Sequence, residues 1–169
     1  MATSMALGEG NLGLVGGRMT YSAQTVTIGT QDVAVTVGGT SSKIGDSAGF
    51  DVGVTGTMTA TFAGTRLCHI RGVLEVESAD NTVTDTAICV TVGGTEVVGS
   101  DSPEQDADTD NAPVLLEVDT HLLVSNGDVI GLGLINGTDT ADVVTIVAAA
   151  MDGNVADFSP ETGWFTITG

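Results

Sequence analysis

Basic and aromatic residues are scarce in this sequence of 169 residues. Only 4 Lys and Arg stand against 22 Asp and Glu, which gives a formal net charge of -18, and aromatic residues make up 4% of the chain. Binding nucleic acid or an anionic membrane by general electrostatics requires a surface rich in lysine and arginine. Four basic residues do not form such a surface, so we expect neither nucleic acid nor a membrane as a partner.

Cysteines and long apolar runs are also few. Cys68 and Cys89 are too few for a disulfide-dense scaffold and lack the spacing of a zinc knuckle. We expect both to be small buried apolar side chains, with one disulfide between them as the alternative. No apolar run approaches the roughly 18 residues that span a bilayer. Residues 1–17 hold no Lys or Arg ahead of a short, glycine-broken apolar stretch, so we expect no signal peptide.

The abundant residue types indicate a folded β protein. Hydrophobic residues make up 41% of the chain and the mean hydropathy is +0.30, which is enough apolar material for one core. The sequence contains 24 glycines, and threonine and valine are similarly frequent. Valine and threonine favour strands and glycine favours turns, so the composition predicts a β protein of one domain.

Alternation of apolar and polar residues is clearest at residues 67–77. One parity holds Cys68, Ile70, Leu74 and Val76, and the other holds His69, Arg71, Glu75 and Glu77. Successive side chains of a strand point to opposite faces, so this pattern predicts a strand with one apolar and one charged face. We expect the charged face to meet water or a partner subunit.

Further strands are predicted along the chain, with turns between them and no amphipathic helix. The strand segments are residues 26–28, 33–37, 50–62, 83–92, 95–98, 114–124, 129–135, 143–151 and 164–167, and the turns are residues 79–81, 93–94, 126–128 and 136–138. The apolar run 143–151 predicts a strand buried on both faces. About eight to ten short strands without helices predict an antiparallel sandwich or barrel.

The first residues do not fit this pattern. Residues 1–19 are rich in glycine, alanine and leucine and have no clear period. We interpret residues 1–19 as an N-terminal arm that orders on contact with another subunit, with simple disorder as the alternative. Residues 20–169 then form the β-sandwich domain.

Two short motifs match the residue patterns of catalytic or cofactor sites but lack the surrounding elements that such sites need. Residues 8–13 match G-x-G-x-x-G but lack the strand before and the helix after that a dinucleotide site needs. Residues 45–49 look like the nucleophile loop of trypsin-like proteases, but no histidine precedes Ser47.

The histidines and the sequon match no site either. Cys68 and His69 are adjacent in a strand and therefore point to opposite faces, and His121 has no second histidine at ligand spacing. Asn136-Gly137-Thr138 is a glycosylation sequon by letter that we interpret as a turn. We expect no catalytic, cofactor-binding or metal-binding residues, and therefore no enzyme.

An acidic stretch follows the predicted strand 95–98. Residues 100–111 have no periodicity and predict a solvated loop. Asp106, Asp108, Asp110 and Glu117 fall at positions 1, 3, 5 and 12 of a calcium-loop register, whose carboxylates suit Ca²⁺. The position that should be glycine is Asn111 and no flanking helix is predicted, so we expect no cofactor here, with Ca²⁺ bound at residues 101–117 as the alternative.

The order of features from Phe62 to Met151 resembles the jelly-roll domain of the C1q and tumour necrosis factor superfamily. The matching features are Phe62-Ala63-Gly64-Thr65 before a central strand, Gly93-Gly94-Thr95-Glu96-Val97 at a strand turn, Leu122 to Asn126 with Gly127-Asp128-Val129, and Leu134-Ile135-Asn136-Gly137-Thr138 before a last long strand. Arg66 stands where that family usually has a tyrosine. The resemblance implies an antiparallel jelly roll that forms a homotrimer and acts by binding.

The resemblance also directs the expected function. A jelly roll with a strongly acidic composition is similar to the capsid decoration, or turret, proteins of tailed viruses such as bacteriophages. This similarity implies a trimer on the outer surface of the virion that binds the major capsid protein and passes through the host cytoplasm during assembly. The alternatives are the receptor- or glycan-binding head of a viral fibre or spike, and a secreted C1q-like adhesion module. The excess of Asp over Lys suits a halophilic source.

Overall fold

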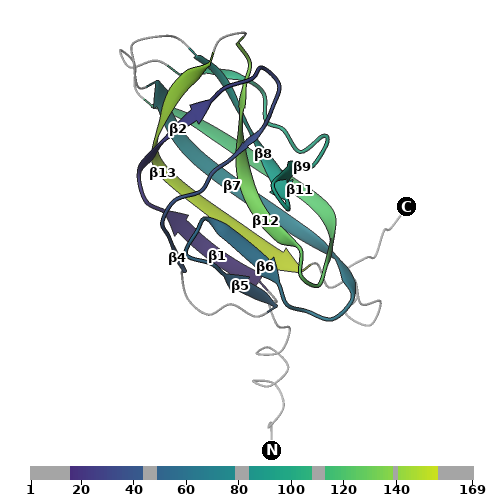
Figure 1. The fold of residues 1–169 in the computed structure, drawn as a ribbon. Helices are drawn as coiled ribbons and strands as arrows, with labels where there is room; N and C mark the ends of the chain where they lie inside the picture. The colour runs from purple at the N-terminus through teal and green to yellow at the C-terminus, as the bar shows by residue number, and fades with distance from the viewer. Residues whose placement is uncertain (1–15, 44–48, 79–83, 108–112, 139–140, 156–169) are drawn as a thin grey trace, which may run out of the picture.

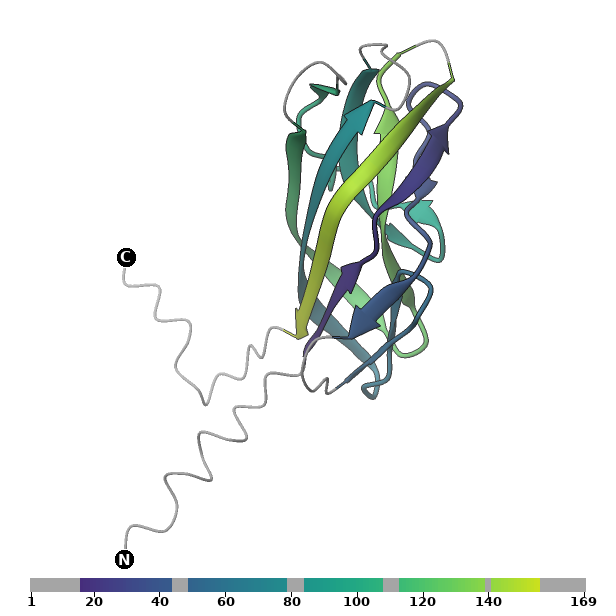
Figure 2. The same cartoon turned by 90° about the vertical axis from the view of Figure 1, so that its left-hand side faces the viewer.

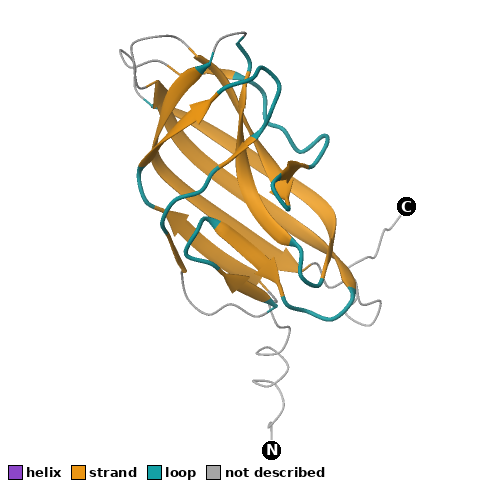
Figure 3. Ribbon diagram, viewed as in Figure 1, coloured by secondary structure: helices purple, strands orange, loops and turns teal. Residues whose placement is uncertain are grey.

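The described part of the protein is built from strands and loops. A computed structural model describes residues 16–43, 49–78, 84–107, 113–138 and 141–155, and within these ranges it contains no helix (Figures 1 and 3). No helix of the described residues is therefore long and apolar enough to cross a membrane. The predicted all-β class is confirmed.

The strands form two antiparallel sheets that pack face to face (Figure 2). In the first sheet the order is β11 (Val114–Ser125), β7 (Thr65–Ser78), β13 (Asp142–Val155), β1 (Gly16–Tyr21) and β4 (Ser41–Lys43), with β2 (Gln24–Ile28) paired to β13. In the second sheet the order is β10 (Gln105–Ala107), β8 (Thr84–Val92), β12 (Val129–Asn136), β6 (Thr57–Ala60) and β5 (Phe50–Val52), with β3 (Val35–Thr36) paired to β12 and β9 (Thr95–Glu96) paired to β8. The described residues hold more strands than predicted because several of them, such as β3, β4 and β9, are two or three residues long.

The core lies between the two sheets and follows the period of two. In β7 the side chains of Cys68, Ile70, Leu74 and Val76 are fully buried, and the alternate side chains face outward. The predicted two-faced strand at residues 67–77 is confirmed. The core contains few aromatic rings, and among them Phe50 and Phe62 pack edge to face with centroids 5.4 Å apart.

The strand buried on both faces is β12, whereas the prediction for residues 143–151 was wrong. In β13 buried and less buried residues alternate, and Val147 is 38% exposed at a bulge between Ile146 and Ala148. In β12 every residue after Val129 is buried. Its Gly131 and Gly133 leave room on the outer side for side chains of β3, β6 and β8 and for Ala34.

The first strand starts inside the segment that was predicted to be an arm. β1 begins at Gly16, pairs with β13 from Gly16 opposite Asn154 to Tyr21 opposite Ala149, and buries Met19 and Tyr21 in the core. The boundary at residue 19 is therefore wrong, since residues 16–19 belong to the sandwich. Residues 1–15 and the strand predicted at 164–167 lie outside the described residues.

The acidic stretch at residues 100–111 is not wholly a solvated loop. Ser100 and Ser102 are buried, and Gln105–Ala107 form β10 on the edge of β8. The Ser102 backbone N–H donates to the Ile88 carbonyl at 2.8 Å, so the segment continues the sheet where a loop was expected. Residues 108–112 lie outside the described residues.

Two predicted turns are confirmed by backbone geometry. Gly93 and Gly94 between β8 and β9 have φ of 59° and 79°, and Gly127 between β11 and β12 has φ of 89°. The Asp128 carboxylate accepts from the Ser125 backbone N–H at 2.8 Å and fixes the second turn. The turn predicted at residues 79–81 lies outside the described residues.

Candidate functional site

The charged face of β7 continues across the outer surface of the first sheet. β11 pairs with β7 along its whole length, which places His121 opposite His69 and Asp119 opposite Arg71. Directly opposed residues of an antiparallel pair point to the same side of the sheet, so their side chains meet. We call this surface the ion-pair face and define it by Arg18, His69, Arg71, Leu115, Glu117, Asp119, His121, Leu123 and Asp152.

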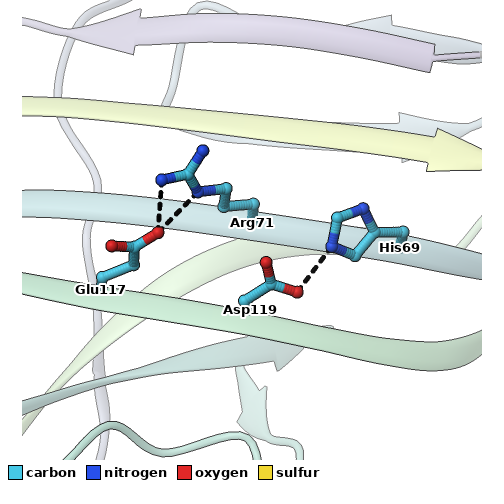
Figure 4. A network of polar contacts seen from close by, with 4 residues as sticks. All are labelled: His69, Arg71, Glu117 and Asp119. Atoms are coloured by element: carbon cyan, nitrogen blue, oxygen red, sulfur yellow. Dashed lines mark hydrogen bonds and ion pairs between the residues drawn. The ribbon is translucent and has the colours of Figure 1, made fainter.

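Three ion pairs lie side by side on the ion-pair face. Arg71 Nε donates to Glu117 Oε1 at 2.7 Å, and His69 Nε2 lies 2.6 Å from Asp119 Oδ1 (Figure 4). One strand further, Arg18 Nε lies 3.1 Å from Asp152 Oδ1. These are the only ion pairs among the residues that the structure describes.

The ion pairs set the charge of the face more than they stabilise the fold. Their side chains are between a third and two thirds exposed, and exposed pairs contribute about 0–1 kcal/mol each. Two of the chain's four Lys and Arg and both histidines lie here, although Glu75 and Glu77 follow along β7 on the same side. With the histidines neutral, two guanidinium groups stand against three carboxylates at the centre of this face, so most of its charge is paired on a chain whose net charge is -18.

The two histidines stack on each other. The ring centroids of His69 and His121 are 4.7 Å apart and the ring planes differ by 19°. The sequence correctly predicted that His69 and Cys68 point to opposite faces. It did not predict that the two histidines meet, because the pairing of β7 with β11 joins segments about 50 residues apart.

Exposed leucines flank the charges on β11. Leu115 is 57% exposed and Leu123 is 71% exposed, and both share the parity of Glu117, Asp119 and His121. Large aliphatic side chains on either side of a centre with paired charges are features of a surface that associates with another protein.

The members of the calcium-loop register that the structure describes are not brought together. Asp106 lies on β10 of the second sheet beside Asp85, whereas Glu117 lies on β11 of the first sheet and pairs with Arg71. The side-chain hydrogen bond between Asp85 and Asp106, with burial and the nearby carboxylates, raises the pKa of Asp85. Asp108 and Asp110 lie outside the described residues, among which no group of three His, Cys, Asp or Glu side chains could hold a metal ion.

A second acidic feature is a hollow on the outer side of the second sheet. It has a volume of about 220 Å³ and is lined by Asp32, Ala87, Glu96, Val98, Gly99, Asp101, Ser102, Glu104 and Ile135. Asp32 has a φ of 56°, in the left-handed region. Nothing at this hollow points to a particular ligand.

Both thiols are buried and free. Cys68 belongs to the core between the sheets, whereas Cys89 lies on the outer side of β8 with Ala87 and Ile135. Burial raises the pKa of Cys68 to about 11, against a smaller opposite effect of Arg66. Burial, and then Glu96 and Asp101, raise the pKa of Cys89 to about 12. The prediction of small buried side chains is confirmed, and the alternative of a disulfide is wrong.

The remaining motifs of the sequence do not contribute to the ion-pair face. Asn136 is buried, and its Oδ1 accepts from the Thr138 backbone N–H at 2.9 Å, which confirms a turn at the sequon. The glycine motif at residues 8–13 and Ser47 lie outside the described residues.

Comparisons with known proteins agree with this fold. No protein-family model matches the sequence, and no curated protein matches it either. Among solved structures, PRD1 vertex protein P5 matches with a TM-score of 0.53 and 13% identity over 85% of this chain and 99% of that one. Murine APRIL matches with a TM-score of 0.48 and 6% identity over 83% and 99%, and the globular domain of zebrafish complement 1qA protein with 0.38 and 13% over 85% and 97%. The chain is therefore an antiparallel jelly roll with a fold similar to that of PRD1 vertex protein P5.

Proposed function

We propose that this protein is a structural protein of a virus particle, a homotrimeric decoration protein that binds the major capsid protein on the outer surface of a tailed-virus head. It stabilises the assembled shell by binding the shell and not its unassembled precursor. Its location is then the virion surface, reached from the host cytoplasm during assembly. We propose a binding role without catalysis.

The observation that carries this proposal is the ion-pair face. Copies of a chain with a charge of -18 repel one another, and the cost of association is lowest where opposite charges are already paired. The centre of the ion-pair face meets this condition, and Leu115 and Leu123 add apolar area that a second copy can cover. The likeness of the fold to a phage vertex protein supports a place on a virus particle.

The first test is the mass of the purified chain in solution. Light scattering at about 1 M NaCl, where salt screens the repulsion between copies, should give three times the mass of one chain. The Leu123→Glu variant places a carboxylate on the ion-pair face and should weaken self-association by at least about tenfold, because like charges in an interface cost several kcal/mol. Val54→Glu is the matched control, since Val54 is 73% exposed and lies between β5 and β6, away from that face. A monomeric wild-type chain, or equal effects of the two variants, would overturn the proposed assembly.

The second test is docking on undecorated capsids of the virus that encodes the chain. Bound density at three-fold or quasi-three-fold positions supports a decoration protein. A stable trimer that ignores capsids but binds cells or glycans moves the function to a receptor-binding head. Robust turnover in a panel of hydrolase substrates would contradict a purely binding role.

A further inference from the structure

The His69–His121 stack brings both histidines of the chain together at one point of the ion-pair face. Histidine is the side chain whose ordinary pKa places its charge change between about pH 5 and pH 8. These are the only two histidines in the chain, and they lie ring against ring with centroids 4.7 Å apart. The imidazole groups of the chain are therefore concentrated at one point of its surface.

The charges around the stack balance one proton and not two. Asp119 on β11 lies 2.6 Å from His69 Nε2 and compensates a proton on that ring. Among the described residues His121 has no hydrogen-bond or ion-pair partner of its own, because the neighbouring carboxylates are taken: Glu117 by Arg71, and Asp152 on β13 by Arg18 on β1. A second proton on the stack places two positive charges side by side against the single carboxylate of Asp119.

We propose that the stacked His69 and His121 rings make association through the ion-pair face sensitive to pH, so that neutral pH favours the assembly of copies of this chain and mild acid opposes it. This rests on the proposed self-association. In the free chain both rings are partly exposed, and water screens the second charge. A second copy on this face removes that water and lowers the local dielectric, so the repulsion grows. The assembled state then binds fewer protons than the free chain, and by linkage acid favours the free chain.

The direction of this effect is opposite to that of the remaining titration. Carboxylates protonate at lower pH than histidines, and their protonation lowers the large negative charge of the chain. Loss of negative charge weakens repulsion between copies, so a chain without the histidine stack should associate more tightly as the pH falls. Dissociation in mild acid is therefore a specific sign of the stack.

The test is light scattering of the full chain as a function of concentration at about pH 7.5 and about pH 5.5, on either side of the ordinary histidine value. The ionic strength is held constant at about 1 M, where the assembly is expected to form. We expect the apparent dissociation constant of wild-type protein to rise at least about tenfold at the lower pH. His121→Gln keeps the His69–Asp119 pair, removes the second titrating ring, and should abolish this rise. Asp119→Asn removes the compensating carboxylate and should move the dissociation to higher pH.

Asp51→Asn is the matched control, because Asp51 is an exposed carboxylate on β5 of the second sheet, outside the ion-pair face. It should leave the pH profile unchanged, and far-UV circular dichroism at both pH values should show that each variant stays folded. A wild-type oligomer that is indifferent to acid overturns the proposed role of the histidine stack and leaves the proposed assembly standing. A His121→Gln variant that still dissociates at the lower pH does the same. A wild-type chain that is monomeric at pH 7.5 and about 1 M NaCl overturns both proposals.

Discussion

Gly56 is held in a backbone conformation that L side chains rarely adopt and is surrounded by other backbone atoms. Its φ is +81°, and a Cβ at this position would lie 2.8 Å from the Val37 carbonyl oxygen and 2.9 Å from Tyr21 Cε1. A left-handed conformation costs an L residue about 1–2 kcal/mol, and overpacking costs about 1–3 kcal/mol. We expect Gly56→Ala to lower the free energy of unfolding by about 2–4 kcal/mol, measured by urea denaturation.

Gly64 provides the control for this substitution. Its φ is +72°, but no atom lies within 4 Å of the position of an added Cβ. Gly64→Ala should therefore lower the free energy of unfolding only by the cost of the left-handed conformation, about 1–2 kcal/mol. Equal losses in the two variants would show that the contacts around Gly56 relax without cost.

The two thiols should be inert in the folded chain. The thiolate is the reactive form, and burial raises the pKa of Cys68 to about 11 and that of Cys89 to about 12. We expect neither thiol to react with a thiol reagent at about pH 8 in buffer, and both to react once urea unfolds the chain. Fast labelling of one thiol in the native protein would contradict its burial.

The same raised values predict a loss of stability in alkali. In the unfolded chain a thiol ionises near its ordinary pKa of 9.0, whereas the folded thiols hold their protons up to about 11 and 12. Their contribution to stability is therefore complete below about pH 9 and is lost as the pH rises through the folded values. Burial raises the pKa of Tyr21 as well, which acts in the same direction. Urea unfolding should show a lower free energy at about pH 10.5 than at about pH 8, and an unchanged value would contradict this.

At the scale of elements, the segment after β9 acts as an edge for β8. The Ser100 Oγ accepts from the Val90 backbone N–H at 2.9 Å, and the Ser102 Oγ accepts from the Ile88 backbone N–H at 3.1 Å. Both serines are buried, so loss of a hydroxyl leaves a buried N–H without its acceptor. Ser100→Ala should cost about 1–3 kcal/mol of unfolding free energy. The exposed Ser42 on β4 is the matched position, and Ser42→Ala should change stability by less than about 0.5 kcal/mol.

The strands and their faces could be predicted from the sequence where apolar and polar residues alternate. β7 is the clearest case, because only one of its faces is apolar and the sequence shows which. β13 was predicted to be buried on both sides, since alanines at positions 148–150 hide the alternation that the structure shows. The serines at 100 and 102 look like loop residues because their polarity, and not their burial, is visible in the sequence.

The ion-pair face could be predicted only in part. That β7 carries charges on one side follows from its own residues, and so does the parity of Asp119 and His121 on β11. That these two sets of side chains meet depends on the register of strands far apart in the sequence, with His69 opposite His121. Register between non-consecutive strands is set by packing of the whole sandwich, which local patterns do not encode.

At the scale of the whole molecule, the balance between net charge and apolar contact decides whether copies associate. Each copy brings a charge of -18, and a homotrimer concentrates three times that charge in one particle. Dissolved salt screens this repulsion, with a Debye length of about 3 Å at 1 M and about 10 Å at 0.1 M. We expect the trimer to be stable at about 1 M NaCl and to dissociate at about 0.1 M, as followed by light scattering.

Screening must be separated from a general effect of concentrated solutes. Sucrose is excluded from protein surfaces and favours compact, associated states without screening charge. At an osmolality equal to that of about 1 M NaCl it should fail to restore the trimer if repulsion between copies is the cause. Rescue by sucrose would assign the salt effect to burial of apolar surface, and a trimer indifferent to salt would show that contacts such as those of Leu115 and Leu123 outweigh the charge.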